Sequence, residues 1–253
     1  MIEFRNLTVG YPDHPMLSGL SFSVPRGSVT ALIGPNGCGK TTLLRTAARR
    51  LQPLAGEILL DGKPLADYDR RELARRLAML PQNRDVPAIS VRMLVSHGRY
   101  PHLGLSRILR EADRRIIGEA MEVTGVASLA ERDLRTLSGG ERQRAYLAMA
   151  LAQDAELILL DEPTTFLDMH HQFALLELIR GLNAAGKTIL MVLHDLAHAL
   201  RYSDRILLLD DGGMVQWGTP GELLSGGQLE RVFRIRVHAM ADAVGFSPLE
   251  DQA

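Results

Sequence analysis

Nine consecutive residues near the start of the sequence have the composition and spacing of a phosphate-binding loop. They are Gly34, Pro35, Asn36, Gly37, Cys38, Gly39, Lys40, Thr41 and Thr42. An apolar run at 29–33 precedes them and a predicted helix at 41–50 follows, which is the context that such a loop requires. Glycines let successive backbone N–H groups converge on phosphate oxygens, Lys40 adds a positive charge, and the Thr41 hydroxyl can bind Mg²⁺. We therefore predict a site for a nucleoside triphosphate.

A pair of carboxylates follows a second apolar run. Asp161 and Glu162 come directly after residues 157–160, which read as a buried strand. Asp161 is predicted to hold Mg²⁺, directly or through water. Glu162 beside it is suited to orient and deprotonate an attacking water molecule. The alternative is a strand that merely ends in solvated acids, and the phosphate loop upstream favours the site.

A third motif lies between the first two. Ser138, Gly139 and Gly140 stand at the start of a predicted helix, where backbone N–H groups and the serine hydroxyl can bind an anion. Taken alone, the same residues also fit a capped helix with a flexible start. We predict a second anion site here because the motif accompanies the other two.

The single cysteine, Cys38, lies within the phosphate loop at a helix start. Such a position can lower the pKa of a thiol and favour its alkylation. The alternative is a small, buried packing residue.

The apolar patterns predict an α/β protein. Residues 2–10 and 17–24 alternate around a turn at 12–15 and indicate an antiparallel sheet. Continuous apolar runs, typical of parallel strands covered on both faces, occupy 29–33, 157–160, 188–193 and 206–209. Predicted helices, which form a mostly helical insertion, occupy 70–77, 90–97, 106–124 and 140–153. A closing hairpin is predicted from 206–209 to 214–218, and the tail 238–253 is unassigned.

Composition excludes other classes of protein. Twenty-nine basic and 30 acidic residues leave a net charge of −1, so we expect no nucleic-acid partner. The longest apolar runs are far shorter than the ~20 residues that span a bilayer. The N-terminal residues show neither a basic leader nor an apolar signal segment, and with one cysteine they indicate a cytosolic chain.

Histidine spacing raises a metal-site alternative. His194 and His198 are four residues apart, as in a helical zinc pair, and His170 adjoins His171. No glutamate follows His194 as it does in zinc proteases, so we do not favour a zinc site.

Together, the three motifs in this order resemble the nucleotide-binding subunit of an ABC transporter, over residues 1 to about 237. The resemblance implies an α/β fold: a P-loop NTPase core, the ABC ATPase core, with an N-terminal antiparallel β subdomain and a helical subdomain inserted at about 84–150. It also implies four further roles. Tyr11 would stack on adenine, Gln82 would approach Mg²⁺ and the attacking water, His194 would contact the γ-phosphate, and Asp168 would cross to a second subunit.

The family resemblance implies a mechanism and partners. Two copies would enclose two ATP molecules head to tail, with 138–140 of one copy over the γ-phosphate held by Lys40 of the other. Hydrolysis at Glu162 would reopen the homodimer. The subunit would sit peripherally on the cytoplasmic face of the inner membrane, against an integral membrane permease, and would act indirectly with an extracytoplasmic substrate-binding protein. Residues 84–105 are expected to contact that permease; packing within the helical subdomain is the alternative.

Other segments of the sequence resemble particular branches of the family. Residues 95–105, and 161–168 followed by His171 and Gln172, resemble the ATPases of iron–siderophore, haem and cobalamin importers. Residues 33–40 and 201–204 are most similar to the ferric-siderophore branch, so iron–siderophore import is favoured. The alternatives are haem or cobalamin import, a non-transport ABC ATPase, and a small-molecule kinase, which would leave 138–140 and His194 without a role.

Overall fold

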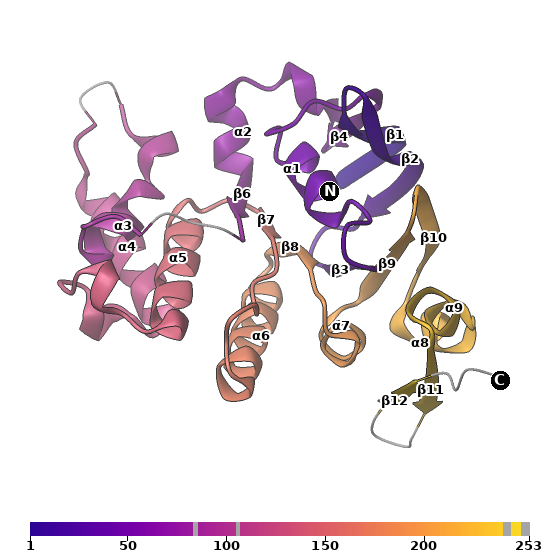
Figure 1. The fold of residues 1–253 in the computed structure, drawn as a ribbon. Helices are drawn as coiled ribbons and strands as arrows, with labels where there is room; N and C mark the ends of the chain where they lie inside the picture. The colour runs from indigo at the N-terminus through magenta and orange to yellow at the C-terminus, as the bar shows by residue number, and fades with distance from the viewer. Residues whose placement is uncertain (83–85, 105–106, 240–243, 249–253) are drawn as a thin grey trace. The chain divides into compact units, whose positions relative to one another are not determined.

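The computed structural model describes residues 1–82, 86–104, 107–239 and 244–248 (Figure 1). The chain divides into two compact units, residues 1–66 with 190–253 and residues 67–189, and each is described by itself. Residues 84, 85 and 105 of the expected permease-contact segment lie outside the described residues. So do residue 106 of a predicted helix and residues 240–243 and 249–253 of the tail.

An antiparallel sheet opens the first unit. Its order is β2-β1-β4-β5, where β1 is Ile2–Tyr11, β2 is His14–Val24, β4 is Ala55–Leu60 and β5 is Lys63–Pro64. Ile2 pairs with both Val24 and Leu60, and the alternate residues Ile2 and Phe4 are buried. The predicted pairing of 2–10 with 17–24 is confirmed. Strand β4 was not predicted, because its first three residues are exposed and its apolar run is only three residues long.

Parallel strands position the phosphate loop in the first unit. Strand β3 (Val29–Ile33) pairs in parallel with β9 (Arg205–Asp210), which pairs in antiparallel with β10 (Gly213–Gly218). Strand β8 (Thr188–Val192) runs from the second unit into the first, where Leu193 N–H donates to the Leu32 carbonyl (3.2 Å). The predicted strands and closing hairpin are confirmed. Because parallel strands end at one edge, the residues after β3 and β8 lie at the same edge.

The remaining elements of the first unit are helices and a terminal hairpin. They are α1 (Lys40–Ala47), α7 (Leu196–Tyr202), α8 (Pro220–Ser225), α9 (Gln228–Phe233), β11 (Ile235–Ala239) and β12 (Val244–Pro248). Helix α1 ends before the predicted residue 50, since Arg49 takes a left-handed φ of 55°. Strands β11 and β12 pair in antiparallel, so the described part of the unassigned tail is a hairpin.

The second unit combines two parallel strands with helices. Strand β6 (Leu77–Leu80) pairs with β7 (Leu157–Leu160), and the unit also holds the start of β8. The helices are α2 (Arg70–Arg76), α3 (Val91–His97), α4 (Glu111–Val123), α5 (Gly139–Ala152) and α6 (Met169–Ala184). Single 3₁₀ turns occupy Tyr100–His102, Ala127–Leu129 and Leu134–Thr136, and another, Leu65–Asp67, begins in the first unit and ends in the second. The prediction that a helix begins at 106 is wrong, because Arg107 has a φ of 51° and Asp113 accepts from the Arg110 N–H at the true start.

Helices α3, α4 and α5 pack against one another (Figure 1). Gly98 permits the close approach of α3 to α5, because a Cβ there would meet the Met149 carbonyl. Next to it, the buried Arg99 guanidinium bonds to Asp113 (3.0 Å) and to the Ala152 carbonyl (2.9 Å). This buried pair anchors the turn that follows, so Tyr100 is presented from a rigid base with 54% of its surface exposed.

Candidate functional site

The phosphate loop follows β3 and leads into α1. Gly34, Gly37 and Gly39 have φ values of 154°, 83° and 103°, which disfavour residues with a Cβ. A Cβ at Gly34 would also meet the Leu209 carbonyl. Gly39 is the N-cap of α1 and provides no side chain to cap it. The glycines therefore set a backbone path that leaves the helix N-terminus open.

The Lys40 side chain folds back onto the phosphate loop. Its side chain is buried, and Nζ donates to the carbonyl oxygens of Gly34 (2.8 Å) and Pro35 (2.7 Å). Within the described part of the chain, the backbone N–H groups of Asn36, Gly37 and Gly39 donate to no other protein group. One charge and several free donors at a helix N-terminus suit a bound polyphosphate.

Cys38 corrects a prediction. The residue is only 3% exposed, and burial raises the pKa of the thiol even though Lys40 acts in the opposite direction. The expectation of a lowered pKa is wrong, because desolvation outweighs the lysine charge. Cys38 is instead a buried part of the loop, with Sγ 2.9 Å from the position of a Cβ at Gly34.

Two more predicted residues belong to the first unit. His194 is exposed and directly follows Leu193, whose N–H bonds to β3 just before the loop. His194 and the phosphate loop therefore leave the same edge of the strands. Tyr11 ends β1 with 47% of its surface exposed, so its ring is accessible for stacking.

The predicted carboxylates lie in the second unit, directly after β7 and beside the end of β6. Asp161 is buried, and its N–H donates to the Leu80 carbonyl (2.9 Å). Glu162 Oε2 accepts from the Gln82 amide and from the Thr165 hydroxyl (3.1 Å). The candidate base is thus held by groups from two different loops.

The backbone of this loop is strained. Glu162 and Phe166, neither of them glycine, have φ values of 50° and 65°. Left-handed conformations of such residues cost of order 1–3 kcal/mol and cluster at functional sites. In this backbone conformation the Glu162 side chain accepts from Gln82, and Phe166 is 91% exposed.

Ser138 caps helix α5. Its Oγ accepts from Glu141 N–H (3.2 Å), and its own N–H donates to Glu141 Oε2 (2.8 Å). These hydrogen bonds hold the pKa of Glu141 below its ordinary value. The helix is capped, as one interpretation of the motif expects. The first-turn N–H groups of Gly139 and Gly140 lie at its N-terminus, where the other interpretation predicts an anion site.

Asp168 caps helix α6. Its carboxylate accepts from the backbone N–H of His171 (2.9 Å) and lies 2.8 Å from His171 Nδ1 through each oxygen. These bonds lower the pKa of Asp168.

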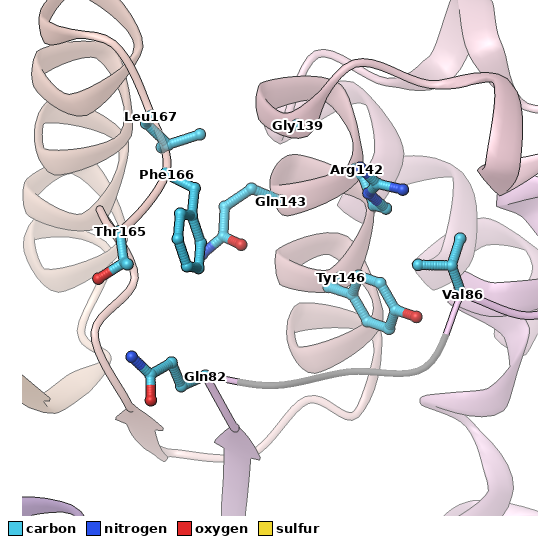
Figure 2. Close-up of a pocket in the computed structure, with 9 residues that line it drawn as sticks. All are labelled: Gln82, Val86, Gly139, Arg142, Gln143, Tyr146, Thr165, Phe166 and Leu167. Atoms are coloured by element: carbon cyan, nitrogen blue, oxygen red, sulfur yellow. The ribbon is translucent and has the colours of Figure 1, made fainter.

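A pocket of about 300 Å³ lies between the loop after β7 and helix α5 (Figure 2). Its lining comprises Gln82, Val86, Gly139, Arg142, Gln143, Tyr146, Thr165, Phe166 and Leu167. Gln143 links helix α5 to the loop after β7, because its side-chain amide donates to the Pro163 carbonyl (2.6 Å). The pocket borders the candidate base through Gln82 and Thr165.

The predicted metal-binding residues offer a hydroxyl, an amide oxygen and a carboxylate from Thr41, Gln82 and Asp161. Such hard oxygen donors are the ligands that Mg²⁺ prefers, so the donor set fits this ion. Thr41 belongs to the first unit, whereas Gln82 and Asp161 belong to the second.

Comparisons with known proteins identify the family. The ABC transporter family matches residues 17–165, which is more than half of the chain. The chain belongs to the ABC transporter family, and it is an ATP-binding, ATP-hydrolysing member. The predicted resemblance and fold class are thereby confirmed.

Three similar proteins illustrate the match. The iron(3+)-hydroxamate import ATP-binding protein of Bacillus subtilis is 45% identical, over 95% of this chain and 90% of that protein. The ferric enterobactin transport ATP-binding protein of Escherichia coli is 44% identical, over 97% and 91%. The ATP-binding cassette MJ0796, solved as a dimer in a post-hydrolysis state with ADP and Pi, is 25% identical with a TM-score of 0.76, over 87% of this chain and 99% of that chain.

Two residues of the site had no predicted role. Thr165 bonds to Glu162, and His171 bonds to Asp168. A histidine three residues after a capping aspartate is a local signal that points to the second pair. No local signal marks the first, because it depends on the left-handed turn at Glu162.

Proposed function

We propose that this chain is the ATP-hydrolysing subunit that powers import of an iron–siderophore complex through a membrane permease. The observation that carries the proposal is the hydrogen bond from Gln82 to Glu162, which couples a loop that follows β6 to the candidate base. The substrate class rests on similarity over nearly the whole chain to proteins named for ferric hydroxamate and ferric enterobactin transport.

The phosphate loop would bind ATP in the first unit. The N–H groups of Asn36, Gly37 and Gly39 and the Lys40 ammonium would hold the β- and γ-phosphates, and Tyr11 would stack on the adenine. Lys40 would exchange its bonds to Gly34 and Pro35 for bonds to phosphate oxygens.

Hydrolysis would depend on Glu162, Gln82 and His194. Glu162 would take a proton from a water molecule as that water attacks the γ-phosphorus and the bond to the β-phosphate oxygen breaks. Gln82 would orient the same water, and His194 would contact the γ-phosphate. Thr41, Gln82 and Asp161 would hold Mg²⁺, which supplies charge neutralisation on the phosphates.

Closure would require a second copy. Ser138, Gly139 and Gly140 lie in the second unit and the phosphate loop in the first, and on this proposal each motif faces the other across a head-to-tail homodimer. The exposed Asp168 would cross to the second copy. The cassette solved as a dimer with ADP and Pi supports the dimer itself.

The permease would supply the membrane path. No helix among the described residues is long and apolar enough to span a bilayer. We assign the chain to the cytoplasmic face of the membrane, with the exposed Tyr100 and its anchored turn as part of the permease contact and an extracytoplasmic binding protein as an indirect partner.

Uptake by cells tests the substrate class. A strain that lacks the gene would be supplied with radiolabelled ferric hydroxamate, ferric catecholate, haem and cobalamin in separate assays. We expect loss of uptake of one ferric siderophore, restored by the wild-type chain and not by Lys40→Ala. Intact siderophore uptake with loss of haem or cobalamin uptake would contradict the iron–siderophore assignment.

A further inference from the structure

His171 lies between two residues that belong to different motifs of the site. Its Nδ1 is 2.8 Å from both carboxylate oxygens of Asp168, and its backbone N–H donates to Asp168 Oδ1 (2.9 Å). Because the carboxylate engages both the ring and the backbone, the orientation of the imidazole is fixed at the start of α6.

The other edge of the same ring lies against helix α5. A Cβ built on the buried Gly140 would be 2.8 Å from His171 Cδ2 and 3.3 Å from Cγ. At 2.8 Å one of the two groups would have to shift, and the bonds of the ring to Asp168 resist its movement, so the imidazole occupies the space that a side chain at position 140 would need. By contrast, the atom nearest to a Cβ on Gly139 would be the Phe166 carbonyl oxygen at 3.9 Å.

Helices α5 and α6 are therefore spaced at their N-termini by one ring. Asp168, the N-cap of α6, holds the ring by hydrogen bonds. The absence of a side chain at Gly140 lets α5 approach the ring closely. If the ring is removed, a gap opens beneath the first turn of α5, whose N–H groups point out of the helix N-terminus.

We propose that His171 is a positioning residue for dimer closure: held by Asp168, it supports Gly140 and so aims the first-turn N–H groups of α5 at the nucleotide of the second copy. This inference rests on the proposed function. It assigns to His171 no contact with the nucleotide and no role in the phosphate loop of its own copy.

A double-mutant cycle tests the contact without any nucleotide. Melting temperatures would be measured for Gly140→Ala, His171→Ala and the double variant. We expect Gly140→Ala to lower the melting temperature, and to lower it by less than half as much when His171 is already alanine. Additive effects of the two substitutions would overturn the proposed contact.

Nucleotide-driven dimerisation tests the role. In a Glu162→Gln background, sedimentation velocity with MgATP would measure the dimer, and a fluorescent ATP analogue would measure binding to the monomer. We expect His171→Ala to weaken dimerisation by about tenfold or more while nucleotide binding to the monomer is unchanged. His171→Asn, which keeps a donor for Asp168 but lacks the ring edge, should behave like alanine.

His170→Ala is the matched control, because the neighbouring histidine is exposed and, among the described residues, forms no hydrogen bond to Asp168 and no contact with Gly140. It should dimerise as the background does. If His171→Ala dimerises as the background does, the role of His171 is overturned and the proposed dimer is not. Failure of the Glu162→Gln chain itself to dimerise with MgATP would overturn the proposed dimer, and this inference with it.

Discussion

The side-chain amide of Gln82 donates a hydrogen bond to Oε2 of Glu162, a residue 80 positions later in the sequence. The same oxygen accepts from Thr165, so two donors hold the candidate base in one orientation. A base that is held in place loses less conformational freedom when water and nucleotide arrive. The link also means that a displacement of the loop after β6 reaches the base directly.

Thr165→Ala should slow ATP hydrolysis and leave ATP binding intact. The Thr165 hydroxyl donates to a carboxylate, and a hydrogen bond to a charged group is worth about 1.5–3 kcal/mol, so we expect kcat to fall by about tenfold or more with KM nearly unchanged. Thr164→Ala is the control, since its hydroxyl makes no hydrogen bond within the described residues. Steady-state ATPase kinetics check the prediction, and equal effects of the two substitutions would contradict it.

Lys40→Ala should weaken ATP binding by about 100-fold, because it removes a charged donor to the phosphates worth about 1.5–3 kcal/mol. Titration with a fluorescent nucleotide measures the affinity. Lys187→Ala serves for comparison, because the Lys187 ammonium pairs with the exposed Asp154 (3.2 Å) in the second unit. If Lys40→Ala binds ATP with wild-type affinity, the assignment of the phosphate loop to the nucleotide site is wrong.

Gly34→Ala and Gly37→Ala should differ in their effect on stability. Both glycines have positive φ, but a Cβ at Gly34 would meet the Leu209 carbonyl, whereas at Gly37 nothing lies within 4 Å. We expect Gly37→Ala to lower the free energy of unfolding by about 1–2 kcal/mol from backbone strain alone. Gly34→Ala should cost about 2–4 kcal/mol, because the steric overlap adds to strain. Urea denaturation distinguishes the two, and equal costs would refute the steric argument.

Cys38 should react slowly with a maleimide. Its burial restricts access, and the raised pKa leaves less thiolate at pH 7 than an ordinary cysteine has. The labelling rate should therefore increase about tenfold per pH unit from pH 7 to 8, and unfolding in guanidinium should accelerate it further. MgATP should slow the reaction, since it would cover the loop. A rate that is fast at pH 7 and independent of pH would contradict the raised pKa.

The sequence predicts what depends on neighbouring residues. The glycines and Lys40 of the phosphate loop, the strand that ends at Asp161 and the cap at Ser138 are local patterns, and the structure has each element where it was expected. Features that depend on distant packing were not predictable. The burial that raises the pKa of Cys38 and the left-handed turn that brings Thr165 to Glu162 arise only in the folded chain. The contact of His171 with Gly140 likewise joins two helices far apart in sequence.

ATP turnover and dimerisation of Glu162→Gln, measured on one preparation, test the central claim most directly. The substitution keeps the buried Asp161 and a hydrogen-bonding side chain at 162, but it removes the base. We predict that the variant binds MgATP, hydrolyses it at least about 100-fold more slowly than the wild type, and sediments as a stable dimer with ATP but not with ADP. Hydrolysis at the wild-type rate, or a chain that stays monomeric with bound ATP, would contradict the account.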